Sequence, residues 1–128
     1  MFYHLSTNDN LKVLTPRVPE TALAIYEDVK TKRVCFAKTI SGCLSALQSI
    51  PEDYYVYVPS NSVQHIVPNS KQVRDAGLTG EVWVLDETPV KCIGRIRSYD
   101  WSKSKRYDVD GQKVTRFFYR WKWIERYT

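Results

Sequence analysis

The first candidate for chemistry is the carboxylate of Glu81, which opens the segment GEVWVLDETPVKCIGRIR. This segment predicts two strands, Glu81–Leu85 and Val90–Arg97, joined by a turn at residues 86–89, because runs rich in Val, Ile and Trp between turn residues favour a half-buried sheet. A carboxylate at the mouth of such a hairpin is held rigidly and stays within reach of a ligand. The alternative is that Glu81 is simply solvated, as most glutamates are.

The second candidate is His4, in the apolar run at residues 2–5. This run predicts a first strand in which His4 and Ser6 point to one face, since side chains alternate along a strand. A lone histidine in a strand is more often a structural group than a ligand-binding one. The proline-bearing loop at residues 15–31 adds candidates by position, because loops of this length in compact domains are often functional: Arg17, Tyr26, Glu27 and Asp28.

The segments that position these residues predict an α+β fold. Residues 33–37 and 53–59 have the composition and alternation of strands. The i, i+3, i+4, i+7 spacing of apolar residues from Ile40 predicts a helix over Ile40–Ser49, capped by Thr39 or Ser41. Smaller elements are expected at residues 11–14, 64–67 and 70–76. Together they predict a mostly antiparallel sheet of about six short strands, whole or split, with one or two short helices.

The C-terminal region is basic and aromatic. The net charge is +5, and residues 98–128 carry eight basic side chains against four acidic ones. Asp110-Gly111 predicts a hairpin turn, and residues 114–123 predict a strand with Phe117, Tyr119, Trp121 and Trp123 on one face and Arg116, Phe118, Arg120 and Lys122 on the other. Cations interleaved with aromatic rings are typical of single-stranded nucleic-acid binding, and the same alternation is typical of any half-buried strand. The candidate partner-binding residues are Arg116, Arg120, Trp121, Lys122 and Trp123.

Length and composition bound the class of protein. The chain has 128 residues, of which 43% are hydrophobic and 26% charged, which is typical of one globular domain. We expect a single domain over residues 1–128, with a core at 2–97 and a basic, aromatic hairpin at 98–128. No apolar run approaches the roughly 20 residues of a membrane span, and the first residues lack a signal-peptide profile. These features predict a cytoplasmic protein that does not bind membranes.

Several kinds of site are excluded by spacing. The two histidines lie far apart and no CxxC pair occurs, so no metal site is expected. Glycine-rich phosphate loops do not occur, which excludes P-loop and Rossmann nucleotide enzymes. The three cysteines lie in apolar segments and are expected to be reduced core residues rather than nucleophiles: Cys35, Cys43 and Cys92.

Residues 2–97 resemble a minimal ADP-ribosyltransferase-like domain, a superfamily that includes small proteins of phages and mobile elements and RNA 2′-phosphotransferases. The resemblance lies in the order of the parts: an early strand with a histidine (FYHLS), a proline-bearing loop (LTPRVP), a strand followed directly by a helix (33–47), and a late strand opened by a glutamate (GEVWV). It implies that NAD is the cofactor, that His4, with Ser6 beside it, contacts the nicotinamide-side ribose, and that Glu81 assists the transfer. It further implies an aromatic residue against the nicotinamide, Tyr26 or Phe36, and places Arg17 at a phosphate.

Three functions follow from these observations. The resemblance implies a transferase that modifies a macromolecular target, such as a counter-defence factor of a phage or mobile element. Cleavage of the ribose–nicotinamide bond builds positive charge on the sugar, so a carboxylate fixed beside it would stabilise the transition state. The basic C-terminal strand favours instead a non-catalytic module that binds an anionic partner, either nucleic acid or an acidic protein surface. A small inhibitor or accessory protein that uses the fold only as a surface is the third.

Overall fold

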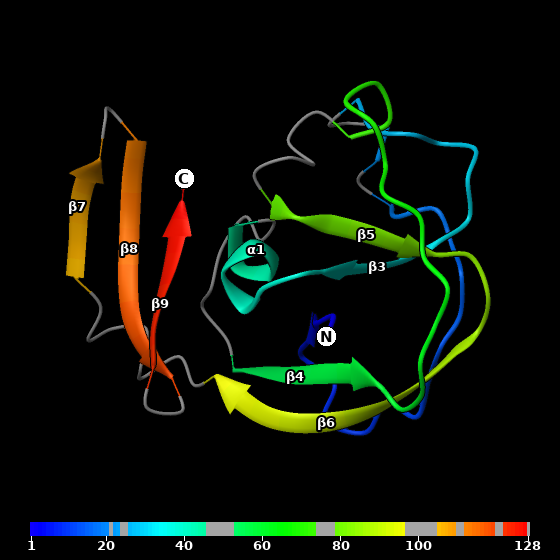
Figure 1. Cartoon of the computed structure of the whole chain (residues 1–128), viewed down its shortest axis with the longest axis horizontal. Coiled ribbons are helices and arrows are strands. Elements are labelled where there is room, and N and C mark those ends of the chain that lie inside the picture. Colours follow the sequence, from blue (N-terminus) through cyan, green and yellow to red (C-terminus); the bar gives the residue numbers. More distant parts are fainter. Residues whose placement is uncertain are drawn as a thin grey trace.

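The computed structural model of the chain describes residues 1–20, 22–23, 26–45, 53–73 and 79–96, together with the backbone of three strands between residues 105 and 127. Pairing between its strands is antiparallel, and its helical content is small, which confirms the predicted α+β class (Figure 1). The elements are, in chain order, β1 (His4–Ser6), β2 (Val13–Leu14), β3 (Val34–Ala37), α1 (Ile40–Ser45), β4 (Tyr54–Pro59), β5 (Glu81–Val84), β6 (Thr88–Ile96), β7 (Lys105–Val109), β8 (Gln112–Tyr119) and β9 (Lys122–Tyr127).

Six of the strands form two sheets that meet at the first strand. One sheet has the strand order β1-β4-β6-β2, and the other consists of β3 and β5. Just before β1, Tyr3 and Ala37 exchange two backbone hydrogen bonds of 2.9 Å, which join the two sheets edge to edge. Figure 1 shows the N-terminal segment between the β3–β5 pair and the β4–β6 pair. The sheet is therefore split between β1 and β3, where a single residue pair joins the two parts.

The core lies on both faces of this split sheet. On one face the main buried cluster consists of Val34, Phe36, Tyr57, Val82, Val84 and Val90. A second cluster joins α1 to β4 and β6 through Leu44, Val56 and Ile96. Strand β4 contributes to both clusters, because its run of valines and tyrosines is apolar on both sides.

Helix α1 is capped by Thr39, one of the two caps that the sequence predicted. The backbone N–H of Gly42 donates to Thr39 Oγ1 over 2.9 Å, which satisfies one of the free donors at the start of the helix. The described helix covers Ile40–Ser45, and residues 46–49 of the predicted helix lie outside the described residues. The cap therefore fixes where the chain leaves β3 and enters the helix.

The predicted hairpin between Glu81–Leu85 and Val90–Arg97 is wrong, although both strands exist. β5 pairs with β3, whereas β6 pairs with β4 and β2. The connection at Leu85–Glu87 instead carries the chain from one sheet to the other. It lacks the Asn-Gly or Asp-Gly pair that favours a tight hairpin turn, and Pro89 in β6 has no N–H to give to a neighbouring strand.

The predicted strand at residues 114–123 is also wrong in its extent. Two strands, β8 and β9, occupy this region and form a three-stranded sheet with β7. Trp123 pairs in register with Phe118, and Lys122 pairs with Tyr119. The single strand predicted from Val114 to Trp123 is therefore replaced by two paired strands, and residues 120 and 121 lie outside the described residues.

Three smaller predictions are revised. Residues 64–67 contribute one isolated bridge, in which Ile66 pairs with Trp83, rather than a strand. Within the described part of 70–76, the chain forms one turn that the Asn69 side chain caps by accepting from the backbone of Lys71 and Gln72. Cys92 is exposed, so the expectation of a core residue is wrong there; it lies next to the register shift between β4 and β6, where the alternation of buried and exposed residues along β6 is interrupted.

Candidate functional site

A cavity of about 140 Å³ lies where β1, β3, β5 and α1 come together. His4, Phe36 and Glu81 line it from three different strands, so the structure brings together three of the residues that the sequence singled out. Its volume is below the about 300–1,000 Å³ of sites that enclose a whole drug-sized ligand. The cavity therefore has room for one ring-sized group and not for a complete dinucleotide.

Glu81 and His4 border this cavity from opposite faces of the sheet. In the β3–β5 register Glu81 pairs with Ala37, on the face that it shares with Trp83. The His4 ring packs edge-on against Phe36, with centroids 6.0 Å apart, and Phe36 belongs to the other face. A ligand that contacts both side chains must therefore reach into the gap where β1 leaves β3.

Glu81 is held by the indole of Trp83, two residues along the same strand face. Trp83 Nε1 donates a hydrogen bond of 2.7 Å to Glu81 Oε2. Trp83 itself is fully buried, so the donor has a fixed position. A hydrogen bond to a carboxylate favours its ionised form, which is the form that would stabilise positive charge in the cavity.

Behind Trp83 lies a buried arginine that ties this strand to the preceding loop. The guanidinium of Arg33 lies 4.2 Å from the centroid of the Trp83 ring, a cation–π contact, and its side chain is fully buried. Arg33 Nη1 donates to the carbonyls of Asp28 and Thr31, at 2.7 and 2.9 Å, and Nη2 lies 3.6 Å from a carboxylate oxygen of Glu27. This arrangement fixes the indole that holds Glu81.

The surroundings of His4 favour its neutral form and one of its two tautomers. Its Nδ1 lies 2.9 Å from the carbonyl oxygen of Cys35, an arrangement that requires the proton on Nδ1 and leaves Nε2 as an acceptor. Burial lowers the pKa of His4 below its ordinary value of 6.5, and the charge of Arg17 lowers it further, while the bond to Cys35 acts in the opposite direction. A neutral imidazole with a free acceptor nitrogen suits a hydroxyl group as its partner.

The two thiols beside the cavity are protonated at neutral pH. Burial raises the pKa of Cys35 to about 11 and that of Cys43 to about 12, and the negative charge of Glu81 adds to both shifts. The Cys43 thiol also donates to the carbonyl of Tyr3 over 3.1 Å. Protonated thiols are poor nucleophiles, because the thiolate is the form that attacks.

The burial of His4 predicts a pH dependence of stability. Because its pKa is lower in the folded than in the unfolded chain, the unfolded chain takes up the proton first as the pH falls below about 6.5. Stability contributed by neutral His4 is therefore complete above that pH and is lost below it. We expect His4→Asn, whose amide can keep the bond to Cys35, to lose less stability between about pH 7 and about pH 5 than the wild type in urea unfolding.

Two features make this measurement specific. The exposed His65 is the matched control, and His65→Asn should keep the pH dependence of the wild type. Asp28 acts at lower pH, because hydrogen bonds from the Thr31 and Lys30 backbone lower the pKa of its carboxyl far below 3.8. An unchanged slope in His4→Asn would contradict the assignment of a neutral, buried imidazole.

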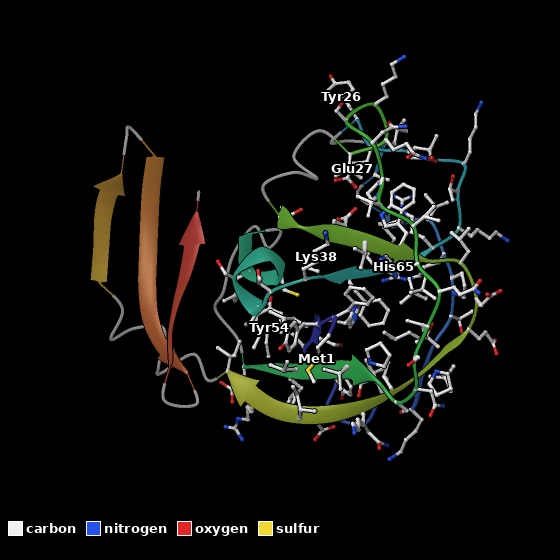
Figure 2. The ribbon with its side chains drawn as sticks, viewed as in Figure 1. Met1, Tyr26, Glu27, Lys38, Tyr54 and His65 are labelled. Carbon is white, nitrogen blue, oxygen red and sulfur yellow. The ribbon has the colours of Figure 1, made fainter. Side chains whose placement is uncertain are left out.

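The other residues predicted for the site lie outside the cavity lining. Ser6 Oγ accepts from the backbone of Asn8 in the turn after β1. Arg17 pairs its backbone with Arg33 and acts on His4 through its charge. Tyr26 is 83% exposed at the tip of its loop, away from β1, with a positive φ of 60° (Figure 2). Of the two predicted aromatic residues, Phe36 therefore lines the cavity and Tyr26 does not, and Tyr3 lines it as well.

The C-terminal candidates are placed only in part. Arg116 lies in β8, and Lys122 and Trp123 lie in β9, where the backbone is described. Arg120 and Trp121 lie outside the described residues. The sheet β7–β8–β9 lies beside α1, with β9 nearest to the helix (Figure 1).

Several residues of the site were missed from the sequence. Gly42 and Thr79 also line the cavity, and the only sequence signal for Gly42 is that a glycine inside a predicted helix costs about 1 kcal/mol relative to alanine. Trp83 follows Glu81 by two positions, so strand alternation alone would have placed its indole beside the carboxylate. The contribution of Arg33 had no local signal, because it depends on the Glu27 loop folding back over the strand.

Comparison with known proteins adds no relative to these observations: no family model matches the chain, and neither a curated protein nor a solved structure shows significant similarity to it. Among the described residues, no helix is long and apolar enough to cross a membrane. No cluster of three or more His, Cys, Asp and Glu side chains in that part of the chain is arranged to hold a metal ion.

Proposed function

We propose that the protein is an NAD-dependent, ADP-ribosyltransferase-like enzyme that modifies a macromolecular target. The observation that carries the proposal is the convergence of His4, Phe36 and Glu81 on one cavity from three strands. One small cavity that combines a neutral imidazole, an aromatic ring and a buttressed carboxylate suits one ring at the ribose–nicotinamide end of NAD, next to the bond that is cleaved.

In this proposal each residue has a separate role. His4 Nε2 would accept from a ribose hydroxyl, and Phe36 would lie near the nicotinamide ring. As the bond from ribose C1 to nicotinamide breaks, its electron pair leaves with nicotinamide and positive charge builds on the sugar, which the Glu81 carboxylate would stabilise. The target nucleophile then bonds to C1 and releases its proton to water. The cavity holds only one end of NAD at this size, so the rest of the molecule would lie outside it.

The test is a thermal melt with and without about 1 mM NAD, combined with an assay for nicotinamide release. A ligand that binds only the folded state raises the free energy of unfolding by about 2.7 kcal/mol at a hundredfold excess over Kd, a shift of several degrees. We expect the wild type to shift, His4→Ala to lose the shift, and Glu81→Gln to keep most of it while losing nicotinamide release.

Two matched controls sharpen the result. Glu87 and His65 are exposed and lie outside the cavity, so Glu87→Gln and His65→Ala should behave as the wild type does. A wild type that shows neither a shift nor nicotinamide release would contradict the proposal. So would a shift that survives His4→Ala and disappears in His65→Ala, because NAD would then bind elsewhere.

A second candidate is a non-catalytic module that binds an anionic macromolecule through the C-terminal sheet. It is favoured by the separate sheet β7–β8–β9, whose strands pair with one another and not with those that carry the cavity. A basic sheet of this kind would bind without involving Glu81. Affinity for an oligonucleotide that falls steeply with salt and is unchanged in Glu81→Gln would favour this function over the transferase.

A further inference from the structure

A second, larger cavity lies at the end of β4, next to the segment that precedes β1. Its volume is about 560 Å³, within the about 300–1,000 Å³ typical of small-molecule sites. It shares no lining residue with the cavity of Glu81. Phe2 and Val58 line it from the two neighbouring segments, and Lys91 lines it from β6, where it pairs in register with Val58. A site here would therefore be independent of the proposed transferase site.

The apolar wall of this cavity is built into the core. Phe2 and Val63 are partly buried and pack against the main hydrophobic cluster, so their positions are set by the fold and not by a ligand. The rings of Phe2 and His65 meet edge to face, with centroids 4.5 Å apart and an interplanar angle of 68°. This pair presents an aromatic wall against which a flat ring can pack.

The polar rim of the cavity has one sign of charge. Lys91 is exposed, and the described residues hold no carboxylate in an ion pair with it. The lining contains no acidic side chain, and Asn61 and Ser62 add neutral polar groups at the rim. An ammonium without a partner beside an apolar wall complements a ligand that carries an anionic group on an apolar ring.

We propose that this cavity binds a small aromatic carboxylate, with the ring against Phe2, His65 and Val63 and the carboxylate at Lys91. Each part of the ligand has a matching feature. The aromatic pair and Val63 remove the ring from water, and Lys91 is the charge that distinguishes an acid from its neutral analogue.

The experiment uses indole-3-acetate as the probe and indole-3-acetamide as its neutral twin, each titrated into the full chain up to about 10 mM and followed by amide chemical shifts in NMR. We expect saturable shifts for both ligands that cluster at Phe2, residues 58–65 and Lys91, with tighter binding of the acid. Lys91→Met should weaken the acid about two- to fivefold, the range of an exposed ion pair, and leave the amide unchanged.

Lys32→Met is the matched control, because Lys32 is an exposed lysine that lies outside this cavity, and it should change neither affinity. Shifts that do not saturate, or that cluster away from the cavity, would overturn the proposal. Equal weakening of acid and amide in Lys91→Met would also overturn it, since the lysine would then act through shape and not through charge. Neither readout involves NAD, so failure here is distinct from failure of the transferase proposal.

Discussion

Replacing Arg33 with methionine is expected to lower the free energy of unfolding by about 3 kcal/mol, although methionine is apolar and long enough to fill much of the space. The substitution leaves the carbonyls of Asp28 and Thr31, which are partly buried, without their donor. It also removes the cation from the Trp83 ring and from Glu27. Each unsatisfied buried group costs about 1–3 kcal/mol, so the carbonyls account for most of the loss.

Urea unfolding of two matched variants separates burial from ion-pair distance. Arg95 lies closer to its partner Asp53 than Arg33 does to Glu27, at 2.7 Å against 3.6 Å, and its side chain is 50% exposed. Arg95→Met should therefore cost at most about 1 kcal/mol, as exposed pairs do. If Arg95→Met proves as damaging as Arg33→Met, the loss does not come from the buried hydrogen bonds and this account is wrong.

Replacing Gly42 with alanine is expected to destabilise the protein by about 3 kcal/mol, the upper end of the usual range for an overpacked site. In an exposed helix the same change stabilises by about 1 kcal/mol, so the expected sign is reversed. The reason is that a Cβ on Gly42 would overlap the backbone carbonyl of Thr79, which cannot rotate away as a side chain can. Helix α1 and the segment before β5 would have to move apart.

Gly80→Ala is the control for this prediction. Gly80 has a φ of +67°, but a Cβ there would meet ordinary contacts at 3.6 Å or more, so the cost should be only the about 1–2 kcal/mol of a left-handed backbone. Both variants are measured by urea unfolding against the wild type. A Gly42→Ala protein that is as stable as the wild type would show that the helix is not held against Thr79.

The strands were predictable to the extent that their signal is local. The run at residues 53–59 and the run at 33–37 are apolar and β-branched or aromatic, and both form strands close to the predicted bounds. The start of α1 was predictable as well, because a threonine cap is read from neighbouring residues. The neighbour with which each strand pairs could not be predicted in this way. Whether β5 pairs with β6 or with β3 depends on residues about fifty positions away, and no local turn signal decides it.

The C-terminal prediction failed for a related reason. Apolar and basic residues alternate from Val114 to Trp123 without a glycine, asparagine or aspartate that would indicate a turn, so the run reads as one strand. The structure has two strands there instead, with Phe118 paired to Trp123. Alternation predicts the faces of a strand and does not predict its end.

The candidate site was predictable in its residue types and not in its shape. Glu81 stood out as a carboxylate at the mouth of a predicted hairpin and His4 as a histidine in an apolar strand, and the cavity contains both although the hairpin does not form. The opposite faces from which they approach follow from the single bridge at Tyr3 and Ala37, which no pattern in the sequence reveals. Residue types alone therefore do not predict the geometry of a site, because the register of the strands that carry the residues is also needed.

The junction at Tyr3 and Ala37, where the two sheets are joined beside β1, also bears on how the chain folds. β1 pairs with β4, roughly fifty positions later in the sequence, and the adjoining Tyr3 bonds to β3, so the strand pairing of residues 3–6 is with distant partners. Closing such long loops costs conformational entropy before the contacts add any stability. Topologies of high contact order therefore fold in milliseconds to seconds rather than microseconds. We therefore expect the cavity beside His4 to be completed after β3 and β4 are both in place to receive the first strand.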